Sequence, residues 1–332
     1  MTTPRQRAIA EFVLDHLVWF MLVIMLILFS IFVPNFFQTG IFVNIVESST
    51  MTGVMAIGLA IVIIAGHMDL SVESVAALAA MVTGLLFCSR GIGLGIVLTP
   101  EWLALPVSLV AALAVGAVIG ALNGFLVVKL RLEAFIVTLA SYIWVRGVVV
   151  ALSGGRSAQD LSPSIRFIGI DTVLGIPLIA WIAILCFVAF SFMMAKTPFG
   201  RHVKLVGGNA VAAFRAGIKV DRLMLTSFIL AGAIAGLAGW LLAIRTSGAT
   251  ANLGVGMVFQ AFAAVVIGGV SLKGGVGHLP GVYAGVLLLH SIQTAINLMG
   301  LPAHYTQVIL GLLVLAAVLL DTLKLQIRQR FA

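Results

Sequence analysis

Long apolar runs limit what this chain can fold into more than any other feature of its sequence. Runs of roughly 15–25 mostly apolar residues recur along its length, and they suit helices that cross a hydrocarbon core of about 30 Å. A membrane β-barrel would instead show short segments of alternating polarity. Hydrophobic residues fill 62% of the 332 positions, whereas about 45–50% is usual for soluble domains. The sequence therefore predicts an integral membrane protein.

The runs predict an all-α polytopic membrane protein with about ten transmembrane helices, some of them short or broken. The expected spans are residues 17–33, 51–65, 75–88, 105–128, 135–152, 173–195, 223–244, 258–270, 276–299 and 306–320. The runs at 51–65 and 75–88 are short for a straight crossing. Either polar neighbours extend these helices, or the chain breaks inside the membrane as in many transporters.

The basic residues predict the orientation. If the N-terminus is cytoplasmic and the spans alternate, most of the 19 Lys and Arg fall on the cytoplasmic side. The outer segments then hold only Arg90, Arg156, Arg166 and Arg245, and Arg146 falls within a span. Because Lys and Arg favour cytoplasmic loops, both termini are expected in the cytoplasm. The net charge of +8 then reflects these loops rather than nucleic-acid binding.

The largest block of charge lies in the middle of the chain, in TPFGRHVKLVGGNAVAAFRAGIKVDR at residues 197–222, which alternation places in the cytoplasm. Asn209 is a suitable N-cap, and Gly217 can end a helix in the left-handed conformation. Residues 210–216 are therefore expected to form a short helix.

Apolar residues of this short helix share one side. Val211, Phe214 and Ile218 are spaced i, i+3 and i+7, which predicts one apolar stripe. A helix of this length is unstable alone. We expect it either to dock into a groove of another protein or to lie on anionic lipid.

The charged block resembles the cytoplasmic loop of permease subunits of ATP-binding-cassette importers in the ribose/xylose/arabinose/galactoside group, within the branched-chain amino-acid/sugar permease superfamily. That loop reads roughly T-x-x-G-R … G-G-N-x-x-A-A-x-x-x-G-I-x-V-x-R. The matching residues are Thr197, Gly200, Arg201, Gly207, Gly208, Asn209, Ala212, Ala213, Gly217, Ile218, Val220 and Arg222. Family-like stretches are also found in PNFFQTGIFVNI, VIIAGHMDLSVESVAAL, EAFIVTLASYIWVRG and AAVVIGGVSLKGGVGHLPGVYAGVLLL, so the resemblance covers nearly the whole chain.

The resemblance implies one permease domain over residues 1–332, with a coupling loop at 196–222, in the bacterial inner membrane. A separate cytoplasmic ATPase would hydrolyse ATP-Mg, so this chain would be no enzyme and would hold no cofactor. A periplasmic binding protein and a second, identical or related permease subunit would complete the importer. The implied ATPase-coupling residues are Asn209, Val211, Ala212, Ala213, Phe214, Gly217 and Ile218. The solute would be a monosaccharide, with a branched-chain amino acid or a nucleoside as alternatives.

One polar segment between two apolar runs departs from the family pattern. The family usually has G-G-I-D-L-S-V-G, where this chain has GHMDLSVE, which adds His67 and Glu73. Ionisable groups at membrane depth are costly and are functional candidates. The segment is a gate or a helix break, a solvated loop, or the proton relay of a secondary transporter that needs no ATPase. Its candidate residues are Gly66, His67, Asp69, Ser71 and Glu73; if helical, Asp69 and Glu73 share a face.

Polar residues inside spans are the candidates for the substrate path, namely Asn44, Glu47, Asn123, Gln260 and Asn297. Their contacts with the solute are expected to be weak, because tight binding would slow release. Arg146 either snorkels to the surface or pairs with a buried carboxylate such as Glu47. The six histidines show no H-x-x-x-H spacing, so no metal site is expected.

Two segments of the chain resemble each other. VIIAGHMDLS at residues 62–71 and VVIGGVSLKGG at 265–275 each run from a β-branched stretch through a small pair into a polar stretch with a leucine. Internal two-fold symmetry is common in transporters. Chance similarity within apolar sequence is the alternative.

Overall fold

A computed structural model describes residues 4–302 and, beyond them, positions 305, 308–309, 311–312, 315–316 and 319, with side chains from His16 onward. The helices are α1 (Pro4–Phe32), α2 (Thr39–Ile64), α3 (Val72–Phe87), η1 (Glu101–Leu103), α4 (Ala104–Val128), α5 (Ala134–Ser153), α6 (Pro163–Ile170), α7 (Leu178–Lys196), α8 (Pro198–Gly208), α9 (Ala210–Arg215), α10 (Val220–Thr246), α11 (Met257–Ile267) and α12 (Leu279–Leu298). The strands are β1 (Cys88–Gly91), β2 (Ala158–Leu161), β3 (Thr172–Val173), β4 (Ile176–Pro177) and β5 (Gly248–Ala249).

Within the described residues, 6 helices are long and apolar enough to cross a membrane: α2, α4 together with η1, α5, α7, α10 and α12. Shorter apolar helices are His16–Phe32, which is part of α1, and α3 and α11. The chain is therefore a mostly helical, polytopic membrane protein. The span predicted at 306–320 lies for the most part outside the described residues.

Two predicted spans have different limits in the structure. The short run at 51–65 belongs to α2, which begins at Thr39, because its polar residues continue the helix instead of forming a loop. The run at 173–195 becomes helical only at Leu178, since the β3–β4 hairpin comes first. Leu174 and Gly175 form its turn with φ of 54° and 77°, as a type I′ turn requires. The sequence predicted an all-α protein, and the short strands correct that prediction.

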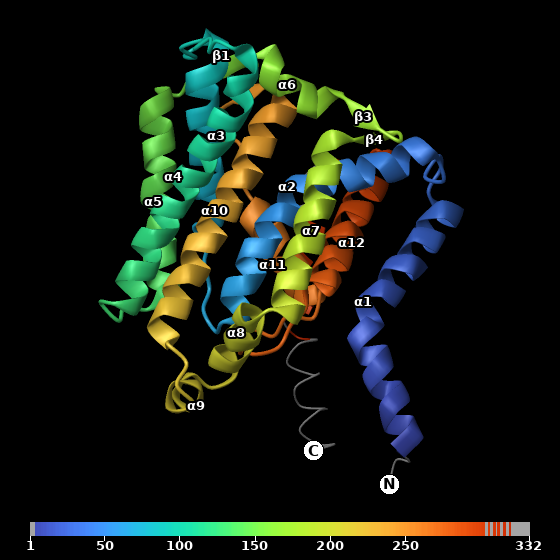
Figure 1. Cartoon of the computed structure of the whole chain (residues 1–332). Coiled ribbons are helices and arrows are strands. Elements are labelled where there is room, and N and C mark those ends of the chain that lie inside the picture. Colours follow the sequence, from blue (N-terminus) through green and yellow to red (C-terminus); the bar gives the residue numbers. More distant parts are fainter. Residues whose placement is uncertain are drawn as a thin grey trace.

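Glycines bring the central helices close together. α10 crosses α4 where Gly116 and Gly120 face Gly232 and Gly236, and a Cβ on Gly116 would overlap the carbonyl oxygen of Gly232. Small residues allow such close backbone approach in membranes. At one side of the bundle, α1 packs on α12 (Figure 1).

The loops gather at two opposite ends of the molecule. β1, β2 and β5 come from three separate loops and form one antiparallel sheet, in the order β1-β2-β5. Figure 1 shows this sheet and α6 at one end and α8 and α9 at the other. The three loops of the sheet are all loops that alternation of the spans places on the outer side, so the fold agrees with that scheme.

The two similar segments end their helices with the same hydrogen bonds. After α2, the N–H of Gly66 donates to Ile63 and that of His67 to Val62; after α11, Gly269 donates to Val266 and Val270 to Val265. Gly66 and Gly269 have φ of 93° and 88°. Both ends are Schellman motifs, so the sequence similarity corresponds to a shared local structure at these helix ends.

Candidate functional site

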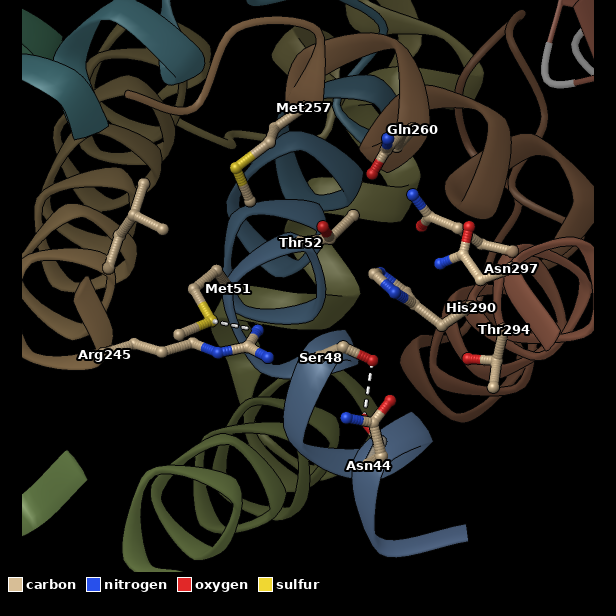
Figure 2. Close-up of a pocket in the computed structure, with 12 residues that line it drawn as sticks. Asn44, Ser48, Met51, Thr52, Arg245, Met257, Gln260, His290, Thr294 and Asn297 are labelled. Atoms are coloured by element: carbon tan, nitrogen blue, oxygen red, sulfur yellow. Dashed lines mark hydrogen bonds between the residues drawn. The ribbon is translucent and has the colours of Figure 1, made fainter. Parts of the chain in front are cut away.

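A polar pocket of about 410 Å³ lies between α2, α10, α11 and α12. Figure 2 shows the polar ends of Thr52, Gln260 and His290 directed toward a common space. The lining residues are Asn44, Ser48, Met51, Thr52, Leu242, Arg245, Met257, Gln260, His290, Gln293, Thr294 and Asn297. Pockets of about 300–1,000 Å³ with a few convergent polar groups are typical small-molecule sites.

Helical periodicity explains how these side chains meet. On α12, the polar lining residues are His290, Gln293, Thr294 and Asn297, spaced i, i+3, i+4 and i+7. This spacing places them on one face of the helix. The sequence interpretation missed all of these except Asn297. A search for polar residues at helical spacing within apolar spans would have found them.

Among the described lining residues, only Arg245 carries a permanent charge. Its Nε lies 3.3 Å from Oε1 of Glu47, and the two side chains are 31% and 26% exposed. Its Nη1 lies 4.0 Å from the sulfur of Met51 (Figure 2). The ion pair therefore joins α2 to α10 beside the pocket.

The predicted substrate-path residues separate into two groups. Asn44, Gln260 and Asn297 line the pocket, and Glu47 lies next to it through Arg245. Asn123 lies elsewhere: its Nδ2 donates to Ser71 over 2.9 Å and its Oδ1 accepts from Ser141 over 2.6 Å.

Asn123 is thus a buried link between helices. Its side chain is fully buried and its two partners lie at the start of α3 and on α5. A buried amide needs such partners, which explains its polarity without a solute. It is not among the residues that line the pocket, and its role in the substrate path stays a prediction.

The segment from Gly66 to Glu73 contains the break between α2 and α3 and the first turn of α3. Residues 67–70 are neither helix nor strand. Asp69 is 1% exposed and accepts from the N–H and hydroxyl of Ser71 at 2.9 and 2.6 Å. A solvated loop is therefore wrong for Asp69 and Glu73, which is also fully buried. Since Asp69 precedes α3, it does not share a helix face with Glu73.

His67 differs from its neighbours. It is only partly buried and stacks obliquely on Phe228, with ring centroids 6.2 Å apart. Burial lowers the pKa of His67, and the Glu133 carboxylate acts in the opposite direction.

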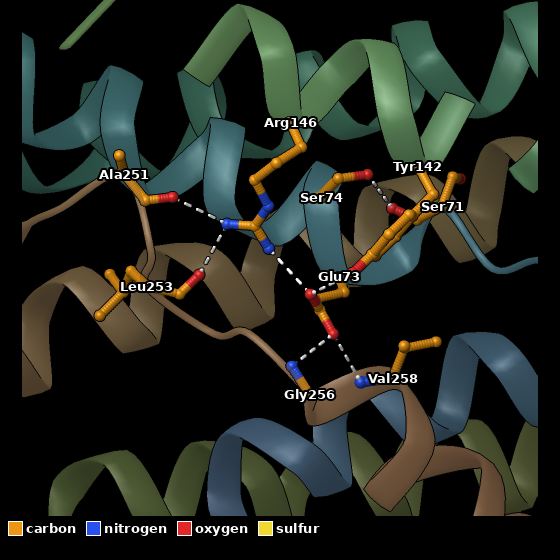
Figure 3. A network of polar contacts seen from close by, with 9 residues as sticks. All are labelled: Ser71, Glu73, Ser74, Tyr142, Arg146, Ala251, Leu253, Gly256 and Val258. Carbon is orange, nitrogen blue, oxygen red and sulfur yellow. Dashed lines mark hydrogen bonds and ion pairs between the residues drawn. The ribbon is translucent and has the colours of Figure 1, made fainter. Parts of the chain in front are cut away.

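Glu73 holds together parts that are distant in the sequence (Figure 3). Its Oε1 lies 2.9 Å from Nη2 of Arg146, and its Oε2 accepts from the N–H groups of Gly256 and Val258 at 2.9 and 3.1 Å. Glu73 therefore serves as the anion at the N-terminus of α11, where unpaired N–H groups favour negative charge.

Arg146 completes this network. Its Nη1 donates to the carbonyl oxygens of Ala251 and Leu253 at 3.0 and 3.1 Å. The snorkelling interpretation was wrong, and so was Glu47 as the partner. Arg146 pairs with Glu73, and Glu47 pairs with Arg245.

Comparisons with known proteins decide the family. A family model described as the permease component of the branched-chain amino acid transport system matches residues 41–318. The chain belongs to this permease family. The ribose import permease protein RbsC of Escherichia coli K12 is 34% identical over 307 residues, covering 91% of this chain and 92% of the relative. The L-arabinose ABC transporter permease protein AraH of Azospirillum brasilense is 35% identical over 293 residues, covering 88% and 83%. No solved structure matches the chain.

The protein is therefore a multi-pass permease of the bacterial inner membrane and a transport component rather than an enzyme. Its charged loop contains α8 and α9. Asn209 caps α9 as predicted, accepting from the N–H of Ala212 over 2.9 Å, and Gly217 has φ of 84°. The predicted helix, expected to end at residue 216, ends at Arg215. α8 was not predicted, although Pro198 at its first turn is a typical helix start.

The outer face of α9 is apolar. Val211 and Phe214 are 62% and 70% exposed, whereas Ala213 is buried. Ile218 does not extend this face, because the helix ends before it and its side chain packs on the core. The predicted stripe of three residues is therefore a pair.

At this end of the permease, the backbone of α8 closely approaches the two helix breaks. The N–H of Gly275 donates to the carbonyl oxygen of Ile64 over 2.8 Å. A Cβ on Gly207 would overlap that same oxygen, and a Cβ on Gly274 would lie 2.8 Å from Gly66. The charged loop is thus in direct contact with the C-terminal end of α2. The other half of the same helix lines the pocket.

Proposed function

We propose that this chain is the transmembrane permease subunit of an ATP-binding-cassette importer for a monosaccharide. The pocket supports this most strongly, since its polar lining consists of amides, hydroxyls, an imidazole and one ion-paired guanidinium. These groups suit a solute with many hydroxyls. The relatives named for ribose and L-arabinose support the same class.

The alternatives fit the lining less well. A branched-chain amino acid carries both charges, yet the two described carboxylates beside the pocket are already engaged, Glu47 by Arg245 and Glu73 by Arg146 and the start of α11. A nucleoside base usually stacks on an aromatic ring, and no Phe, Tyr or Trp is among the lining residues that the structure describes.

A proton-coupled secondary transporter would use His67, Asp69 and Glu73 as its relay. Both Glu73 oxygens are already engaged by a guanidinium and backbone N–H groups. We assign Gly66–Glu73 to a gate instead, because it borders α8 at Gly66. Asp69→Asn should then reduce transport without altering its pH dependence.

The assembly follows from the charged loop. We place the end with α8 and α9 in the cytoplasm, with about ten spans in total and both termini on that side, as the basic residues favour. The single domain 1–332 then presents its loop at 196–222 to the ATPase. A periplasmic binding protein docks at the opposite end, and a second permease subunit completes the path.

Loss of one pocket donor tests the assignment. Gln260→Leu keeps the side-chain size but removes the amide that lines the pocket. Sugar uptake by the complete importer should fall roughly tenfold, the effect of about 1.4 kcal/mol. Phe259→Leu on the exposed side of α11 is the control. Equal uptake by both variants, at equal membrane levels, would remove the pocket from the transport path.

A further inference from the structure

We propose that Glu47 sets the charge selectivity of the pocket: by pairing with Arg245, it lets the pocket accept uncharged sugars and exclude their acids. This rests on the proposed function and goes beyond it, since it names a residue that separates two classes of polyhydroxyl solute.

The geometry gives Arg245 two separate properties. A guanidinium has five N–H donors, and the described contacts engage only Nε, with Glu47, and Nη1, with the sulfur of Met51. The remaining donors are free to bind hydroxyls. Its positive charge, in contrast, is balanced by a carboxylate oxygen 3.3 Å away. Arg245 therefore offers directed hydrogen bonds without a net charge.

The positions of the two residues make this balance effective. Both side chains are largely buried, at 31% and 26% exposure, so salt screens them less than it screens surface charges. Arg245 lines the pocket, while its partner Glu47, on the same helix as Asn44 and Ser48, is not among the described lining residues. A solute carboxylate near Arg245 would meet both charges, and their effects would largely cancel.

A second feature beside the pocket that could bind an anion is already occupied. α11 begins at Met257, which lines the pocket together with Gln260. The N-terminus of a broken helix commonly binds the anionic group of a solute in transporters. Here Glu73 occupies that position through Gly256 and Val258. A solute acid would therefore meet an ion-paired guanidinium at Arg245 and N–H groups of α11 that Glu73 already occupies.

The test compares neutral and acidic sugars on the full chain in nanodiscs of zwitterionic lipid. Ligand-detected saturation-transfer NMR would give apparent affinities for D-ribose and for its acid, D-ribonate. The unmodified chain should prefer ribose. Glu47→Gln keeps the side-chain shape and leaves Arg245 uncompensated, so the ribonate-to-ribose affinity ratio should rise roughly tenfold. The gain should shrink at high salt.

Two further variants complete the test. Arg245→Gln leaves Glu47 without its partner, so the affinity for the cationic sugar D-glucosamine should rise relative to that for ribose. This variant tests the same charge pairing if Glu47→Gln fails to fold. The double variant Glu47→Gln/Arg245→Gln should return the ribonate-to-ribose ratio to near its starting value.

The outcomes are distinguishable. If the unmodified chain binds ribose but Glu47→Gln leaves the ratio unchanged, the charge role of Glu47 is wrong and the sugar assignment stands. Equal binding of ribose and ribonate by the unmodified chain also overturns the inference. If the unmodified chain binds no neutral sugar, the proposed substrate class is wrong, and the inference about Glu47 is wrong as well.

Discussion

At the scale of single residues, the buried carboxylate of Glu73 links α3 to α5 and α11. It is fully buried on α3, yet it holds Arg146 of α5 and the start of α11. A buried charge without its partner is costly, whereas a paired and hydrogen-bonded one is tolerated. The network fixes the position of the short helix that carries Met257 and Gln260 into the pocket.

Glu73→Ala should therefore destabilise the permease by about 3–5 kcal/mol, because it leaves a largely buried guanidinium unpaired. Glu73→Gln should cost less, since the amide oxygen still accepts a hydrogen bond. Thermal unfolding in a mild detergent measures both. Glu101→Ala, at an exposed carboxylate, is the control and should change little. Similar melting temperatures for Glu73→Ala and the control would contradict this role.

The sequence predicted some of these residues and not others, for physical reasons. Gln260 and Asn297 were predictable because a polar residue in an apolar span needs a polar environment, whereas Asn44 precedes the predicted span at 51–65 and reaches the pocket because α2 begins at Thr39. Asn123 also lies in an apolar span, but Ser71 and Ser141 supply its polar environment. These partners are distant in the sequence, so only the fold shows them. Arg146 and Glu73 lie 73 positions apart, so no local pattern could pair them.

At the scale of elements, α9 followed from local chemistry, while α2 did not. An Asn cap and a left-handed Gly act within one turn, so the limits of α9 were predictable to one residue. The polar start of α2 resembles a loop, because its residues face a pocket that tertiary packing creates. The sheet requires three distant loops to meet and was likewise beyond a local pattern.

The apolar face of α9 carries the docking prediction. Phe214→Asp should weaken co-purification of the ATPase, because burying a Phe contributes roughly 1.5–3 kcal/mol and a buried carboxylate adds a desolvation cost. Docking should fall at least about tenfold. Folding should be spared, since Phe214 is 70% exposed.

Arg215→Ala is the matched control, because it leaves Val211 and Phe214 in place. If the Phe214→Asp protein retains its ATPase as firmly as the Arg215→Ala protein, α9 lies on lipid instead.

The contact between α8 and α2 predicts a different defect. Gly207→Ala would push α8 away from the end of α2, so transport should fall roughly tenfold, within the usual range of site-to-site coupling. ATPase docking should persist, because α9 is unchanged. Gly208→Ala is the control, since the nearest atom to its Cβ would be 4.0 Å away. Equal transport by both variants would exclude this contact as the route of coupling.

At the scale of the whole molecule, the two ends have separate tasks in our account. The end with α8 and α9 receives the ATPase. The pocket lies among α2, α10, α11 and α12 and binds the solute. The positions of the breaks after α2 and α11, both touching the α8 end through Gly66 and Gly275, connect the two. Overall class and topology were readable from apolar runs and basic residues, because membrane thickness and charge bias act on the whole chain.

The most direct test of the central claim is the energy source for uptake. The permease would be reconstituted in proteoliposomes with and without its ATPase and binding protein, and entry of labelled ribose or arabinose would be measured. We predict uptake that requires ATP and both partners and that a protonophore leaves unchanged. Uptake by the permease alone, driven by a proton gradient and abolished by the protonophore, would contradict the account and identify a secondary transporter.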